Sequence, residues 1–135
     1  MTFWTVAEIF RLMAITAQLS GLPMAKEIPF VFQEPDAEIQ RQYDCGYKYC
    51  PAVYAFTDPR SQEIHISDDL GPYSANTVLV HELTHWLEWK AGVNQGNSGQ
   101  CANERLALNT EAKYSFQYEH KVTEYPPQPC ELAAP

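Results

Sequence analysis

Two histidines and a glutamate lie close together in the segment TVLVHELTHWLEW, residues 77–89. His81 and His85 are four residues apart, so on a helix their imidazoles lie on one face, one turn apart. At this spacing two imidazoles can bind one metal ion, and zinc suits nitrogen and carboxylate ligands. Glu82, next to His81, can accept a proton from a water on that ion. The H-E-x-x-H pattern therefore indicates a zinc site of the metallopeptidase type.

The residues around this pattern are almost all apolar, so the helix that carries it is expected to be buried. The apolar positions are Val78, Leu79, Val80, Leu83, Trp86, Leu87 and Trp89. Buried polar groups need partners, and buried charges need them more. Two core histidines and a glutamate without a metal would need separate partners. A shared metal ion is the simpler interpretation.

A catalytic zinc ion takes three protein ligands and a water, so a third ligand must come from elsewhere in the chain. The candidates are His65, Asp68, Asp69, Glu104, Glu111 and His120. No H-x-x-G-x-x-H follows His85, which excludes the metallopeptidases with that extended motif. In NERLALNTEAKYSFQY, Glu104 and Glu111 would share a helix face with Ala107, a small residue that permits close packing. Either glutamate fits.

The chain resembles the gluzincins, the thermolysin-like zinc metallopeptidases. HELTH is followed, nineteen residues after His85, by Glu104 in NERLA. More specifically, the layout is similar to short bacterial zincin-like domains that carry LVHELTH, a cysteine and NE in this order. The resemblance covers about residues 52–118 and includes a strand–turn–strand similar to the zincin edge hairpin. It implies that His81, His85 and Glu104 bind one Zn2+ per chain and that Glu82 is the general base.

The predicted activity is hydrolysis of peptide bonds by zinc-activated water, with Glu82 as general base. The oxyanion of such a reaction needs a hydrogen-bond donor, for which the resemblance offers no motif match. The candidates are Tyr73, Tyr114, Tyr118 and Tyr125, and Tyr118 would share the Glu104 face. His65 is a candidate cleft residue, although a surface position is the alternative. Two other functions fit the same motif: an interaction module that retains zinc, and a structural zinc site with a fourth protein ligand.

Apolar periodicity predicts the elements that hold these residues. Helices are expected at residues 3–20, 36–43, 74–91 and 100–118, and strands at residues 27–33, 52–56 and 63–67. The order predicts one α+β domain over residues 1–135. By the resemblance it is a minimal zincin-like domain, with a small, mainly antiparallel sheet whose edge hairpin packs on the H-E-x-x-H helix and the following glutamate-bearing helix. Strand 63–67 is the expected edge along which a peptide or protein substrate would bind.

The four cysteines are an even number without a C-x-x-C motif. Proximity favours a Cys45–Cys50 disulfide, and a Cys101–Cys130 disulfide would tether the Pro-rich tail at residues 125–135. Four free thiols in a cytosolic protein are the alternative. Two disulfides predict a secreted or periplasmic protein.

The charge balance limits the partners. Seventeen acidic residues against nine basic ones give a net charge of −8, which argues against nucleic acid as a partner and favours neutral or basic substrates. No uninterrupted apolar run reaches the length of a membrane span. The N-terminal segment lacks a basic start and is interrupted by Glu8 and Arg11, so it predicts an amphipathic helix rather than a signal peptide.

Overall fold

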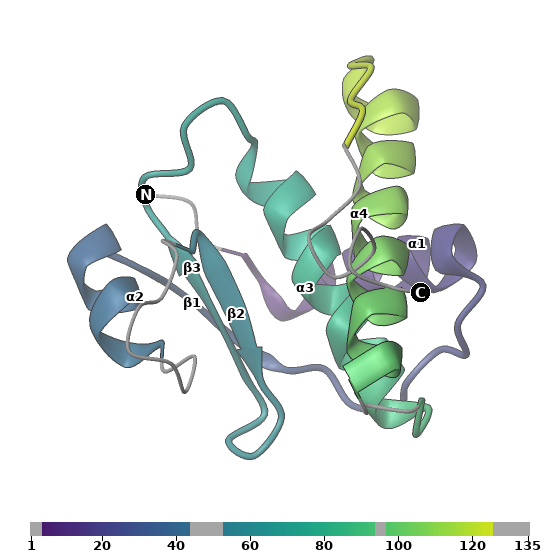
Figure 1. Ribbon diagram of the computed structural model, residues 1–135, viewed down its shortest axis with the longest axis horizontal. Coiled ribbons are helices and arrows are strands. Elements are labelled where there is room, and N and C mark those ends of the chain that lie inside the picture. Colours follow the sequence, from purple (N-terminus) through teal and green to yellow (C-terminus); the bar gives the residue numbers. More distant parts are fainter. Residues whose placement is uncertain (1–3, 44–52, 94–96, 126–135) are drawn as a thin grey trace.

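A computed structural model describes residues 4–43, 53–93 and 97–125, of which 97–101 as backbone only. In these ranges four helices pack with a three-stranded sheet (Figure 1). The elements in chain order are α1 (Val6–Ser20), β1 (Phe30–Glu34), α2 (Asp36–Gln42), β2 (Ala55–Asp58), β3 (Glu63–Ser67), α3 (Ala75–Lys90) and α4 (Asn97–Glu119). The predicted α+β class is confirmed.

The sheet has the strand order β1-β3-β2 and is mixed, so the prediction of a mainly antiparallel sheet is wrong. β2 and β3 form the predicted antiparallel hairpin, whereas β1 pairs with β3 in parallel. The prediction that strand 63–67 is an edge is therefore wrong, because β3 is bonded on both sides. The alternation of apolar and polar residues in β3 indicates which side chains face the core. It does not indicate which strands pair with β3. The edges of the sheet are β1 and β2.

Helix α1 begins at a capping box in which Thr5 and Glu8 bond each other's backbone N–H groups. It ends at Gly21, whose φ of 80° is a left-handed conformation that glycine adopts without strain. Leu12 and Met13 are buried on the face that packs on the rest of the core. The Trp4 indole donates a hydrogen bond to the Asn76 side chain at 2.8 Å, which ties the start of α1 to α3.

Helix α3 lies at the centre of the molecule, between α1, α4 and the sheet (Figure 1). The Ser74 hydroxyl caps its first turn by accepting from the Thr77 N–H. The predicted burial is confirmed for most of the apolar positions, of which several have no exposed surface: Leu79, Val80, Leu83, Trp86 and Leu87. Trp89, near the end of the helix, was expected to be buried as well but is 38% exposed. The Trp86 indole donates to the backbone carbonyl of Glu27 at 3.1 Å, so its one polar group is satisfied.

Helix α4 crosses α3 with the fully buried Ala107 on the packed side. Near its end, the Glu119 carboxylate accepts hydrogen bonds from the hydroxyls of Ser74 and Thr77. His120 then has a φ of 57°, and the Lys121 N–H bonds back to the Ser115 carbonyl at 3.1 Å. The chain thus turns back beside α4 after the helix.

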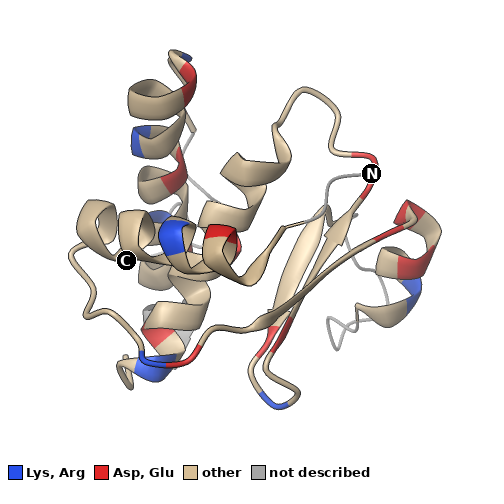
Figure 2. Cartoon of the chain, turned by 180° about the vertical axis from the view of Figure 1, so that it is seen from behind, with Lys and Arg blue, Asp and Glu red and all other residues tan. Residues whose placement is uncertain are grey.

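Acidic residues outnumber basic ones in the sequence and occur on α2, at strand ends and on α4 (Figure 2). No helix among the described residues is long and apolar enough to cross a membrane. The side chains of all four cysteines lie outside the described residues. The disulfides Cys45–Cys50 and Cys101–Cys130, and the secreted or periplasmic location inferred from them, therefore stay predictions.

Candidate metal centre

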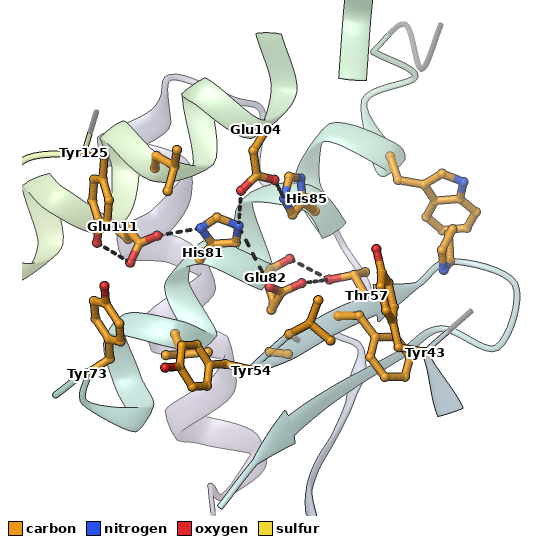
Figure 3. Close-up of a pocket in the computed structure, with 17 residues that line it drawn as sticks. Tyr43, Tyr54, Thr57, Tyr73, His81, Glu82, His85, Glu104, Glu111 and Tyr125 are labelled. Carbon is orange, nitrogen blue, oxygen red and sulfur yellow. Dashed lines mark hydrogen bonds and ion pairs between the residues drawn. The ribbon is translucent and has the colours of Figure 1, made fainter. Parts of the chain in front are cut away.

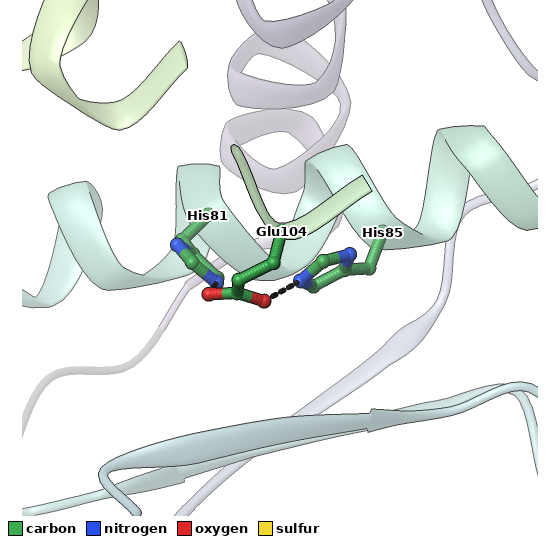
Figure 4. Close-up of side chains that lie close together, drawn as sticks. All are labelled: His81, His85 and Glu104. Atoms are coloured by element: carbon green, nitrogen blue, oxygen red, sulfur yellow. Dashed lines mark hydrogen bonds and ion pairs between the residues drawn. The ribbon is translucent and has the colours of Figure 1, made fainter. Parts of the chain in front are cut away.

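The two histidines of the H-E-x-x-H motif lie one turn apart on the face of α3 that meets α4 (Figure 4). Their ring centroids are 5.0 Å apart. Glu104 on α4 bridges them, because its Oε1 lies 3.1 Å from the His81 Nε2 and its Oε2 lies 3.0 Å from the His85 Nε2. Glu104 lies nineteen positions after His85 in the sequence, and the packing of α4 on α3 brings it to the two histidines.

The donor atoms fit a zinc ion. One ligand atom from each of His81, His85 and Glu104 lies within 4.8 Å of the other two. Two imidazole nitrogens and a carboxylate oxygen are the ligand set of many catalytic zinc sites. Among the residues that the structure describes, no other group of histidine, aspartate and glutamate ligand atoms converges in this way.

Each imidazole also bonds a second carboxylate through its other nitrogen. Glu111 Oε1 lies 2.6 Å from the His81 Nδ1, and Glu88 Oε1 lies 2.9 Å from the His85 Nδ1. A carboxylate at Nδ1 holds the proton there and leaves the Nε2 lone pair for a metal ion. Glu111, the rival third ligand, therefore lies on the far side of the His81 ring from Glu104. Its position is that of a support for a ligand.

The pKa values of the cluster reflect this density of carboxylates. Burial by itself lowers the pKa of both histidines, but the hydrogen bonds that the imidazoles donate to the glutamates outweigh it. The pKa of His81 is raised well above its usual value, and that of His85 rises to about 9. Burial raises the pKa of Glu104, yet its bonds to both histidines leave that pKa well below the usual value. Without a cation both imidazoles thus carry a proton at Nε2 as well as at Nδ1, and a divalent ion can displace the two Nε2 protons.

Glu82 lies beside this cluster and takes no part in it. Its Oε2 is 4.0 Å from the His81 Nε2. The hydroxyl of Thr57, on the edge strand β2, lies 2.9 Å from Oε1 and 3.1 Å from the Glu82 backbone carbonyl. Glu82 is buried, with 6% of its surface exposed. Its carboxylate is therefore held between β2 and His81, within reach of a small molecule at the cluster.

The centre opens into a cavity of about 890 Å³ between β2, α3 and α4 (Figure 3). This volume is within the range of small-ligand sites. The described lining contains no lysine or arginine and is rich in aromatic rings: Tyr43, Tyr54, Phe56, Tyr73, Trp89 and Tyr125. A ligand in this cavity would contact rings and carboxylates.

The structure separates the further candidates that the sequence offered. Tyr73 and Tyr125 line the cavity, whereas Tyr114, Tyr118 and His65 do not. Tyr118 stacks on Tyr114 and is 46% exposed. It shares a helix face with Glu104, but fourteen residues at 1.5 Å each place it roughly 21 Å further along α4.

His65 lies on the face of the sheet that points away from α3. Its ring is stacked between Phe32 and Phe56, and its nitrogens contact Glu34 and Glu63. Strand alternation separates His65 from its neighbours in the core, Ile64 and Ile66. Its contacts fit a structural histidine.

Thr57 and Glu88 are contacts of the centre that the sequence interpretation did not include. Glu88 follows His85 by three residues, a spacing at which helix side chains meet, so it could have been identified. Thr57 could not, because its contact with Glu82 depends on how the hairpin packs on α3.

The chain was also compared with known proteins. Comparisons with protein families, curated proteins and solved structures give no match to it. Inference about its function therefore starts from the geometry of the centre and its cavity.

Proposed function

We propose that this protein is a zinc-dependent hydrolase that cleaves peptide bonds, and that its active site is the cluster of His81, His85 and Glu104. One observation carries the proposal: two imidazole Nε2 atoms and a carboxylate converge, while the Glu82 carboxylate remains outside the cluster beside them. This is also the arrangement that the resemblance to gluzincins implies for HELTH and NERLA.

The roles of the residues follow from their positions. A zinc ion at this centre would polarise the scissile carbonyl and make water nucleophilic near neutral pH. Glu82 accepts the proton of the attacking water and passes it to the leaving amine. The Thr57 hydroxyl restrains Oε1 of Glu82, so the other oxygen, near the His81 Nε2, is the one that accepts the proton.

The edge strand β2 replaces strand 63–67 as the proposed docking strand for an extended peptide. Within the described ranges β2 pairs with β3 on one side only, and its residues line the cavity. Unpaired backbone groups at such an edge can bind a further strand. The rings of the cavity favour apolar side chains, and its carboxylates disfavour acidic ones.

Two features favour an open, catalytic site over a structural one. A structural zinc site has four protein ligands, and within the described part of the chain the cluster has three. The Glu82 carboxylate, 4.0 Å from the His81 Nε2, is bonded to Thr57 instead. The adjoining cavity gives a substrate access to the remaining position.

The test is metal analysis joined to peptide hydrolysis, with wild type and Glu82→Gln compared. We expect one zinc per chain in both proteins, and a hydrolytic rate at least about 100-fold lower in Glu82→Gln, because general base catalysis is worth about 10²–10⁴-fold. If the wild type carried no zinc after purification and bound none when zinc was added, the proposal would be overturned. Equal hydrolysis by both proteins would show that the activity does not come from this site.

A further inference from the structure

Glu111 is a buried carboxylate whose two oxygens have partners from different parts of the chain. Oε1 faces the His81 Nδ1 at 2.6 Å, and Oε2 accepts a hydrogen bond from the Tyr125 hydroxyl at 2.7 Å (Figure 3). Glu111 exposes only 6% of its surface, and a buried carboxylate oxygen without a donor is costly. Tyr125 therefore supplies the hydrogen-bond donor for the second oxygen of Glu111, the carboxylate that contacts His81.

The segment 120–125, here called the C-terminal strap, brings Tyr125 to this position. The strap begins where His120 adopts a φ of 57° and the Lys121 N–H bonds to the Ser115 carbonyl. It then runs back beside α4 (Figure 1). Had the helix continued, fourteen residues at 1.5 Å each would have put Tyr125 roughly 21 Å from Glu111 along the axis. The reversal makes the contact possible.

The Tyr125 hydroxyl acts as a donor. Burial and the Glu111 carboxylate both raise the pKa of Tyr125, so the phenol keeps its proton. The proton is directed at Oε2 of Glu111, which fixes the orientation of the carboxylate and presents Oε1 to the His81 Nδ1. A carboxylate held in this way fixes the tautomer and the ring orientation of the histidine.

We infer that Tyr125 is a positioning residue for the metal centre, which acts through Glu111 on His81 and couples the C-terminal strap to metal binding. This inference rests on the proposed function, because it requires a metal ion at His81. It assigns the strap a role in the centre although none of its residues is a metal ligand.

The probe is Co2+ alone, whose visible spectrum reports the number and geometry of its ligands. We expect Tyr125→Phe to bind Co2+ up to about 10-fold more weakly than wild type, which is at most the lower end of the 10- to 100-fold loss for the carboxylate that it holds, and to alter the visible bands. Tyr118→Phe is the matched control, because it removes a hydroxyl from an exposed ring outside the cavity. This control should equal wild type.

A double-mutant cycle separates positioning from a general effect on folding. In a Glu111→Ala background, Tyr125→Phe should have no further effect on Co2+ affinity, because the carboxylate through which Tyr125 acts on His81 is absent. The inference would be overturned if Tyr125→Phe lowered Co2+ affinity equally in both backgrounds. It would also be overturned if Tyr125→Phe had the affinity and spectrum of wild type. Neither result would contradict the metal centre itself. Failure of wild type itself to bind Co2+ would instead overturn the proposed function.

Discussion

Removal of Glu104 tests the ligand set most directly, because Glu104 contacts both histidines through their Nε2 atoms. Zinc binding to small metal sites is worth about 10–16 kcal/mol near pH 7. Shared over three protein ligands, this gives about 3–5 kcal/mol for each. At about 1.4 kcal/mol per tenfold change, Glu104→Ala should weaken zinc binding by roughly two to four orders of magnitude.

Glu111→Ala provides the comparison. It removes a carboxylate of the same helix that contacts the other nitrogen of His81, and loss of such a support costs about 10- to 100-fold in affinity. Lys113→Ala, on the exposed side of α4, should leave zinc binding unchanged. The order of affinities is therefore wild type and Lys113→Ala, then Glu111→Ala, then Glu104→Ala.

Competition with a chromophoric zinc chelator at one fixed pH measures all four proteins. Circular dichroism of each variant checks that its helices are retained. A larger loss in Glu111→Ala than in Glu104→Ala would refute the reasoning, since the two carboxylates would then have exchanged roles.

Two further predictions concern protons and the general base. Because the pKa of His85 is raised to about 9 and that of His81 also lies well above its usual value, zinc binding at pH 7.5 should release about two protons, and apparent affinity should increase as the pH rises toward 9. Calorimetry in two buffers of different ionisation enthalpy measures the release, and a value near zero would mean that the imidazoles are not the ligands. Thr57→Val removes the hydroxyl that contacts Glu82 Oε1. We expect about a 3- to 10-fold lower kcat, as for the loss of one hydrogen bond, with unchanged zinc content. Loss of zinc in this variant would contradict a role of Thr57 in orienting the general base.

The sequence predicts the helices of this protein well because their signals are local. Helix α3 was expected at residues 74–91 and spans Ala75–Lys90. Ser74 caps it, and Gly92, with a φ of 71°, follows its end. The i, i+4 spacing of His81 and His85 likewise follows from the helix alone. The metal ligation and catalysis assigned to these residues stay predictions.

Features that depend on tertiary arrangement were predicted less well. Strand 63–67 was expected at an edge, but the parallel pairing of β1 with β3 makes it central, and this pairing joins residues more than thirty positions apart in the sequence. The strand expected at 52–56 is found at Ala55–Asp58. The helix period predicts that Tyr118 shares a face with Glu104, but Tyr118 lies roughly 21 Å from Glu104 along the helix axis.

Helix α3 is both the most buried helix and the carrier of two proposed ligands, so occupancy of the centre and the folding equilibrium are linked. A ligand that binds only the folded chain stabilises it by about 2.7 kcal/mol at a hundred times its dissociation constant. Leu83, which has no exposed surface, lies between the two histidines in the sequence. Repacking of this side chain would move the imidazole rings along with the core. Substitutions of core residues in α3 are therefore limited to those that keep the positions of His81 and His85.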